Sequence, residues 1–358
     1  MKIGFIGLPK SGKTTLFNAL TGSSAQVSAF STGRVGPNLA SVRVYDERVE
    51  KLAAIYKPKR LVYPAIDIVD LAGVNEGDGK ADAFSGDLMK LARTVDALAI
   101  VLRNFKDTTS SSPAPLVDLK KIEQELLLAD LIISEKRLEK VEASLKKGGG
   151  GNSVQSLRAE HQVLKKIVDA LNEGRPLRQL EFDDNQKALI RCFQFLTQKP
   201  AMVILNSDEA SAGKNDSILE AIREHYQVVE FAGQLEMELS QLDEESARAF
   251  MEDLGIKESA KDRLIALAYR VLGYISFFTV GEDEVKAWNI RRGATALEAA
   301  AAIHTDLARG FIAAECFHYD ALMAAGSDKA VRSNGQFKLV GKDYMVRDGD
   351  ILSIRFNL

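Results

Sequence analysis

The first third of the chain alternates short apolar runs with segments of helical character. Residues 3–6, 65–69 and 97–102 are almost continuously apolar. Strands with this pattern are usually buried on both faces, as in a parallel sheet covered by helices. Similar runs return at residues 201–205 and 228–231. We therefore expect an α/β domain whose sheet is interrupted in sequence and then resumed.

The interruption has the periodicity of helices. Over residues 118–147 and 154–171, apolar residues recur every three or four positions among Glu and Lys. Four glycines and Asn152 separate the two segments. This pattern predicts two long helices joined by a glycine turn, which would form an antiparallel coiled-coil arm inserted into the α/β domain. Two ordinary core helices are the alternative.

The pattern changes again near residue 275. Strand-like pieces at 275–280, 285–290, 338–340 and 351–356 surround a helical segment at 295–305, with turn signals at Gly281, Asn334-Gly335 and Asp348-Gly349-Asp350. This indicates a compact α+β module. The predicted organisation is therefore an α/β domain at 1–117 and 197–274, an inserted arm at 118–196 and a C-terminal module at 275–358.

Composition limits the possible partners and cellular setting. The 358 residues include 47 Lys and Arg against 50 Asp and Glu, a formal net charge of -3. Nucleic acid would therefore have to meet a local basic patch, and we expect no DNA partner. Cys192 and Cys316 lie far apart in sequence, and no apolar run approaches the ~20 residues of a membrane span. We expect a cytoplasmic protein without a membrane partner.

The segment Gly7-Leu8-Pro9-Lys10-Ser11-Gly12-Lys13-Thr14-Thr15 is a complete phosphate-binding loop between a predicted strand and a predicted helix. Its glycines let backbone N–H groups curl around phosphate oxygens, and the helix N-terminus adds its dipole. Lys13 would contact the terminal phosphates. Thr14 would offer its hydroxyl to Mg²⁺. The loop predicts a bound nucleoside triphosphate.

Two further motifs follow predicted strands. Asp70-Leu71-Ala72-Gly73 would place a carboxylate near Mg²⁺ and a glycine N–H near the terminal phosphate. Asn206-Ser207-Asp208-Glu209 stands where GTPases carry Asn-Lys-x-Asp, whose aspartate binds the guanine edge. Glu209 is longer than that aspartate and should not make the same paired contact. We therefore predict a preference for ATP over GTP.

These motifs, in this order, make the chain resemble the YchF or Obg-like ATPase family of translation-factor-class P-loop proteins. The resemblance covers essentially the whole chain. It includes Pro37-Asn38, Lys199-Pro200 and the helical insertion. The C-terminal module is similar to the family's β-grasp-like TGS domain in four segments: Phe277-Phe278-Thr279-Val280-Gly281, Ile303-His304-Thr305-Asp306, Arg309-Gly310-Phe311-Ile312 and Gly341-Lys342-Asp343-Tyr344.

The resemblance implies Mg-dependent ATP hydrolysis coupled to ribosome-associated work. Residues Lys10, Ser11, Gly12, Lys13, Thr14 and Thr15 would wrap the phosphates. Asn206, the Ser207 backbone and Glu209 would frame the base, with Phe231, Ala232 and Gly233 as the remaining wall. The predicted catalytic residues are Lys13, Asp70 and Gly73, and the predicted Mg²⁺ ligands are Thr14, Asp70 and Thr32.

The chain also departs from the family pattern. Lys10 stands where the family usually has Asn, and Thr14 where it usually has Ser. Arg34 occupies the position of the threonine that completes the Mg²⁺ shell, so either Thr32 takes that role or Arg34 approaches the phosphates. Val74 replaces the water-orienting glutamine of many GTPases, and an apolar side chain cannot orient water. These changes suggest a diverged paralogue with slow hydrolysis or a partner-supplied catalytic group.

Two other functions fit the same residues. One is a GTP-driven switch of the same architecture, and the other is a non-hydrolysing nucleotide sensor that binds the ribosome or RNA. RNA contacts would require basic residues of the arm or the C-terminal module to gather on one face. The candidates are Lys136, Arg137, Lys140, Lys146, Lys147 and Arg158 in the arm, and Arg291, Arg292, Arg309, Lys329, Arg332 and Lys338 in the module. A merely solvated surface is the alternative for both sets.

Overall fold

The computed structural model describes residues 1–21, 37–71, 84–106, 112–147, 152–253 and 259–357. It divides into two compact units. The first comprises Met1–Ala40 and Asp67–Lys261, and the second comprises Ser41–Ile66 and Asp262–Leu358. In the parts of the chain that the structure describes, every helix is too short or too polar to span a bilayer.

A six-stranded sheet organises the first unit. Its strands, in spatial order, are β2 (Asn38–Arg43), β4 (Ala65–Asp70), β1 (Lys2–Ile6), β5 (Ala97–Asn104), β6 (Ala201–Ser207) and β7 (Gln227–Phe231). The pairs β1–β4, β1–β5, β5–β6 and β6–β7 are parallel. The first six residues of β5 are all buried, as expected for a central strand covered on both faces.

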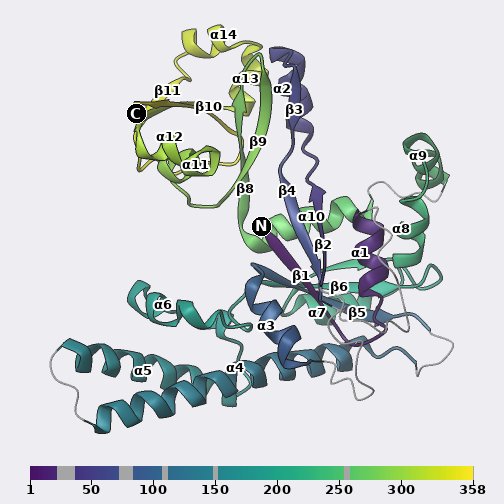
Figure 1. Ribbon diagram of the computed structural model, residues 1–358. Helices are drawn as coiled ribbons and strands as arrows, with labels where there is room; N and C mark the ends of the chain where they lie inside the picture. The colour runs from purple at the N-terminus through teal and green to yellow at the C-terminus, as the bar shows by residue number, and fades with distance from the viewer. Residues whose placement is uncertain (22–36, 72–83, 107–111, 148–151, 254–258, 358) are drawn as a thin grey trace. The chain divides into compact units, whose positions relative to one another are not determined.

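Helices cover this sheet on both sides. On one face, α3 (Gly86–Thr94), α4 (Pro115–Lys146) and α7 (Asp216–Arg223) share a core with alternate residues of β5 and β6. On the other side, α1 (Lys13–Thr21) and α8 (Gly233–Leu239) lie next to each other (Figure 1). The predicted continuous helical region from Glu236 to Leu272 is instead divided among α8, α9 (Glu244–Asp253) and α10 (Ala260–Leu272).

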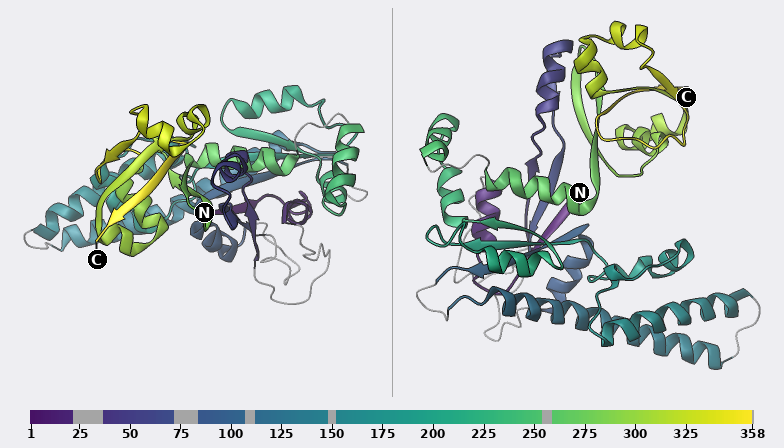
Figure 2. Two further views of the ribbon diagram at one scale, coloured as in Figure 1. Left: turned by 90° about the horizontal axis from the view of Figure 1, so that it is seen from above. Right: turned by 180° about the vertical axis from the view of Figure 1, so that it is seen from behind.

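The inserted segment forms the two expected long helices. α4 starts with Pro115 at its first turn, where a missing N–H costs no hydrogen bond. α4 and α5 (Asn152–Asn172) run side by side in antiparallel directions in both views of Figure 2. A small core of Val163, Ile167 and Leu171 with Phe182 and Phe195 holds α5 against α6 (Asp184–Ile190) and the chain that follows it. The predicted glycine turn at 148–151 lies outside the described residues.

The second unit contains its own six-stranded sheet. The spatial order is β11 (Lys338–Val340), β10 (Phe311–His318), β12 (Asp350–Phe356), β8 (Tyr274–Val280), β9 (Glu284–Arg291) and β3 (Arg60–Val62). The helices are α2 (Glu47–Tyr56), α11 (Ala296–Ile303), α12 (Thr305–Arg309), α13 (Tyr319–Ala325) and α14 (Asp328–Ser333). A capping box between Thr295 and Glu298 starts α11. The predicted fold class, a P-loop α/β domain with an inserted helix pair and a C-terminal α+β module, is confirmed.

Residues 41–66 belong to the second unit, although their place in the sequence had grouped them with the α/β domain. The reason is that β3 pairs in parallel with β9, and Val49 and Leu52 of α2 are buried against Phe278 and Val285. The second unit is thus built from two separate stretches of chain.

Candidate nucleotide-binding site

The phosphate loop joins the end of β1 to the start of α1, and its backbone is closely packed. Gly12 has a φ of 87°, in the left-handed region that glycine adopts at least cost. A Cβ on Gly12 would lie 2.1 Å from Asn206 Nδ2, and one on Gly7 would lie 2.5 Å from the Val101 carbonyl oxygen. Both positions therefore exclude larger residues. Lys10 also has a positive φ, of 62°, and is exposed.

Lys13 lies buried at the centre of this loop. Its Nζ donates to the carbonyl oxygens of Gly7 at 3.0 Å and Leu8 at 2.9 Å. Burial lowers the pKa of Lys13 to about 8, and the nearby charge of Asp70 opposes this shift. The loop thus holds a partly desolvated ammonium group, which would interact more strongly with an anion than a solvated one does.

Thr14 and Asp70 come together beside the loop. The Thr14 hydroxyl donates to Asp70 Oδ2 at 2.9 Å, and Asp70 is fully buried at the end of β4. Asn38 Nδ2 lies 3.5 Å from the same carboxylate oxygen. Hydroxyl and carboxylate oxygens are the protein ligands that Mg²⁺ prefers. The other two predicted members of this part of the site, Gly73 and Thr32, lie outside the described residues, as do Arg34 and Val74.

Asn206 connects the phosphate loop to the predicted base side. Its Nδ2 donates to the Ser11 carbonyl oxygen at 3.0 Å, and its Oδ1 accepts from the Gly233 N–H at 3.1 Å. Gly233 is the first residue of α8, and Ala232 precedes it as the N-cap. Phe231, at the end of β7, is fully buried. One amide side chain therefore fixes two backbone segments that are far apart in sequence.

Ser207 and Glu209 differ in their surroundings. The Ser207 hydroxyl is buried and donates to Glu230 Oε1 at 2.7 Å. Glu209 lies in the turn after β6, and its side chain is exposed. Thr15, in the first turn of α1, is half-buried. The structure thus brings Ser11, Gly12, Asn206 and Gly233 into one network, and Glu209 projects from the turn that follows it.

Several polar residues near the site were not predicted from the sequence. Asn38 approaches Asp70, while Asn104, Asn215 and Glu230 surround Ser207. One signal was available for Glu230, because a charged residue stands within the otherwise apolar run 228–231. A charge buried in a strand needs a partner, and this one has three hydrogen-bond donors.

The donors of the loop fit a magnesium-bound triphosphate. Ser11 Oγ is buried and has no hydrogen-bond partner among the residues that the structure describes. Such a group is costly unless a ligand or water satisfies it. Lys13 supplies a cation, the start of α1 supplies backbone N–H groups, and Thr14 and Asp70 supply oxygen ligands. The site residues themselves stay a prediction.

Comparison with known proteins identifies the family. Residues 2–137 match a family model described as "50S ribosome-binding GTPase", and residues 274–357 match the model YchF-GTPase_C, described as "Protein of unknown function (DUF933)". The chain is 35% identical to "Ribosome-binding ATPase YchF" of Bacillus subtilis over 99% of both chains. It is also 35% identical to the Haemophilus influenzae protein of that name, over 100% of this chain and 99% of the relative.

A solved structure agrees over the same length. The structure titled "Structure of the Schizosaccharomyces pombe YchF GTPase" is 29% identical in sequence, with a TM-score of 0.86. The match covers 99% of this chain and 97% of the other. The resemblance inferred from the sequence motifs is therefore confirmed, and the chain belongs to the YchF family.

Proposed function

We propose that this protein is a magnesium-dependent ATPase that prefers ATP to GTP, hydrolyses it slowly and works in association with the cytoplasmic ribosome. The observation that carries the proposal is the joint geometry of Lys13, the Thr14–Asp70 pair and Asn206 in one loop-centred site. The printed names of the relatives, ribosome-binding ATPases, support the same function.

The chain's own residues would divide the work as follows. The loop backbone and Lys13 bind the phosphates and offset their charge. Thr14 and Asp70 hold Mg²⁺, which when bound neutralises charge that develops on the phosphate oxygens. Asn206 keeps the loop and the start of α8 in register, so the base and phosphates are held at a fixed separation. Positioning of this kind supplies much of the catalysis of phosphoryl transfer.

Choice of base would depend on the turn after β6. Guanine presents two adjacent N–H donors that a short aspartate accepts together, whereas adenine presents a single exocyclic amino donor. Glu209 is exposed and has a longer reach, which favours a single contact to that amino group. The lysine that would pack on the purine of a GTPase is Ser207, whose hydroxyl points instead to Glu230.

GTP is the second candidate substrate, since one family model and the fission yeast structure carry GTPase in their names. Calorimetric titration of the full chain with Mg-ATP and Mg-GTP separates the two. We expect ATP to bind at least about tenfold more tightly, equivalent to about 1.4 kcal/mol. Tighter binding of GTP would contradict the assignment of Glu209.

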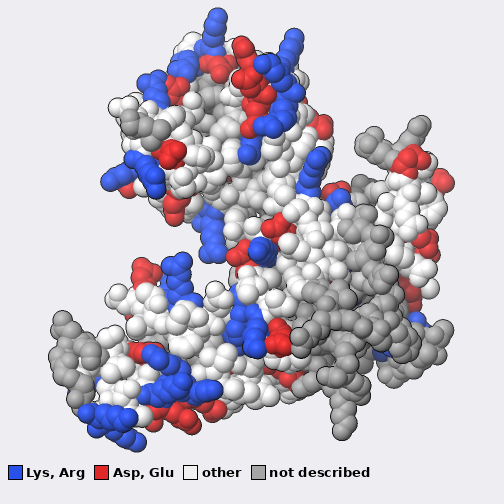
Figure 3. Space-filling view, viewed as in Figure 1, with Lys and Arg blue, Asp and Glu red and all other residues white. Residues whose placement is uncertain are grey.

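Contacts with the ribosome would come through basic surfaces. Figure 3 shows Lys and Arg side chains gathered toward the outer end of the α4–α5 pair, beside acidic ones. Lys140, Lys146 and Lys147 are exposed there, whereas Arg137 is paired with Glu160 at 2.7 Å. In the second unit, the exposed Arg292 and Arg347 line a pocket of about 380 Å³. These residues are the proposed contacts for phosphate groups of RNA.

A further inference from the structure

A polar cluster behind the base-side turn is not used by the proposed mechanism. It lies at the C-terminal ends of β5, β6 and β7, where Asn104, Ser207 and Glu230 come from three neighbouring strands. In the register of the sheet, Asn104 is level with Ser207, and Glu230 is level with Leu205. The three side chains therefore share one face of the sheet, opposite to the face that carries Asn206.

Glu230 is the centre of this cluster. Its Oε1 accepts from the Ser207 hydroxyl at 2.7 Å and from Asn215 Nδ2 at 2.6 Å, and its Oε2 accepts from the Gly213 N–H at 2.9 Å. Asn104 Nδ2 donates to the Ser207 hydroxyl at 3.1 Å, which completes the network. One carboxylate thus joins both ends of the turn that runs from Ser207 to Asn215.

The same turn is also braced internally. Asp208 Oδ1 accepts from the Ser211 N–H at 2.9 Å and from its hydroxyl at 2.6 Å. The hydrogen bonds from Ser211 lower the pKa of Asp208, although partial burial opposes the shift. Glu209 lies between this brace and the Ser207 anchor and is exposed. The backbone that carries Glu209 is therefore fixed on both sides, and its side chain is left to meet a ligand.

We propose that Glu230 is a positioning residue for base selection. It anchors the turn 207–215 from behind, so that Glu209 and the Ser207 backbone are presented to the nucleotide base in one arrangement. This inference rests on the proposed function, because it assumes that the turn contacts the base. It predicts that loss of Glu230 weakens recognition of the base and leaves recognition of the phosphates intact.

The experiment measures binding by full-length variants of three ligands with Mg²⁺: ATP, GTP and inorganic tripolyphosphate, which lacks a base. In Glu230→Ala, we expect the ATP affinity to fall about tenfold, since hydrogen bonds to a charged group are lost, and the ATP-to-GTP ratio to move toward one. The tripolyphosphate affinity should stay within about twofold of the wild-type value.

Two matched variants sharpen the test. Glu230→Gln keeps an oxygen that accepts from Ser207 and Asn215, so we expect it to restore most of the ATP preference. Glu220→Gln removes an equal charge from an exposed position on α7 and should change none of the three affinities. Thermal unfolding of each variant shows whether the fold is retained.

Three results would overturn the inference. The first is an unchanged ATP-to-GTP ratio in Glu230→Ala. The second is a parallel loss of ATP and tripolyphosphate affinity, which would indicate general damage to the unit. The third is wild-type protein that binds tripolyphosphate but neither nucleotide more tightly, which would remove the proposed function as well.

Discussion

Gly12 shows how one residue fixes the geometry of the phosphate loop. Its left-handed backbone and its closeness to Asn206 Nδ2 leave no room for a side chain. The glycine spacing could be predicted from the sequence because it belongs to a local motif. The contact with Asn206 could not, because 195 positions separate Asn206 from Ser11, whose carbonyl oxygen it binds.

The substitution Gly12→Ala should therefore disable binding while the fold survives. The added methyl would displace Asn206 and strain the backbone, and we expect the ATP dissociation constant to rise about a hundredfold, or about 2.7 kcal/mol. Gly86→Ala is a matched control, since a Cβ there meets no atom within 4 Å. Calorimetric titration checks both. Near-native affinity in Gly12→Ala would argue against this packing.

Lys13 predicts an unusual pH dependence of binding. Its folded pKa of about 8 lies below the ordinary value of 10.5, and the phosphates favour its charged form. ATP affinity should therefore be full below pH 8 and fall as pH rises through 8, by about tenfold between pH 7 and pH 9. Lys13→Ala should bind weakly with no such slope. A flat affinity from pH 7 to pH 9 in the wild type would contradict this.

The same shift has the opposite effect on stability. Because folding disfavours the charged form of Lys13, the folded state of the free protein binds fewer protons than the unfolded state between pH 8 and pH 10.5. The contribution of Lys13 to folding stability therefore rises with pH in that window while ATP affinity falls. Urea unfolding of the wild type and of Lys13→Ala, compared at pH 8 and pH 10, checks this sign.

At the scale of elements, a buried ion pair fixes the helix pair to the sheet. Asp130 of α4 is fully buried and accepts from Arg93 of α3 at 2.8 Å, from the N–H groups of Leu196 and Thr197, and from the Thr197 hydroxyl. The helical periodicity predicted α4 correctly. It could not show that one inward position is an aspartate with partners 37 and 66 residues away.

Removing this carboxylate should be costly. Asp130→Ala leaves Arg93 and two backbone N–H groups without their acceptor, so we expect a loss of about 3–5 kcal/mol of unfolding free energy. Asp130→Asn keeps one acceptor oxygen and should lose less. Glu139→Ala, exposed on the same helix, is the control and should change little. Urea unfolding monitored by circular dichroism measures all three, and a loss below about 1 kcal/mol in Asp130→Ala would refute the assignment.

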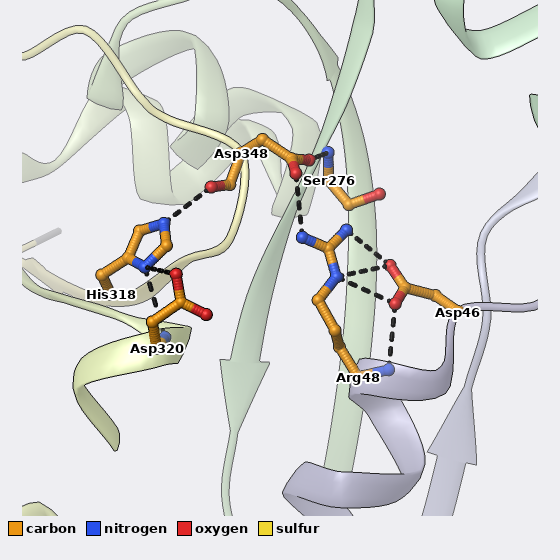
Figure 4. Close-up of polar contacts among 6 residues, drawn as sticks. All are labelled: Asp46, Arg48, Ser276, His318, Asp320 and Asp348. Carbon is orange, nitrogen blue, oxygen red and sulfur yellow. Dashed lines mark hydrogen bonds and ion pairs between the residues drawn. The ribbon is translucent and has the colours of Figure 1, made fainter. Parts of the chain in front are cut away.

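At the scale of the whole molecule, the second unit depends on a segment from the first fifth of the sequence. Figure 4 shows how Arg48 of α2 lies between Asp46 and Asp348, with Nη2–Oδ2 and Nη1–Oδ2 distances of 2.7 and 2.9 Å. The Asp348 carboxylate also accepts from the Ser276 N–H. Arg48 stacks 5.0 Å from the ring centre of Phe278. Pairings across 300 residues leave no local signal, which is why the sequence pattern assigned residues 41–66 elsewhere.

Arg48→Ala should therefore destabilise the second unit. The change removes hydrogen bonds to two carboxylates and the contact with Phe278, and we expect a loss of about 2 kcal/mol of unfolding free energy. Lys51→Ala is the control, because its pair with Glu47 on the same helix is largely exposed. Hydrogen exchange of residues 274–291 reports the change locally. Unaltered protection in Arg48→Ala would show that this network contributes nothing.

The central claim is that this site turns over ATP. Its most direct test is a single-turnover measurement of phosphate release from Mg-ATP by excess full-length protein, with Lys13→Ala as the paired control. The proposed function predicts slow release of one phosphate per ATP by the wild type and none above background by Lys13→Ala. Tight ATP binding without Lys13-dependent release would contradict it and favour a non-hydrolysing nucleotide sensor.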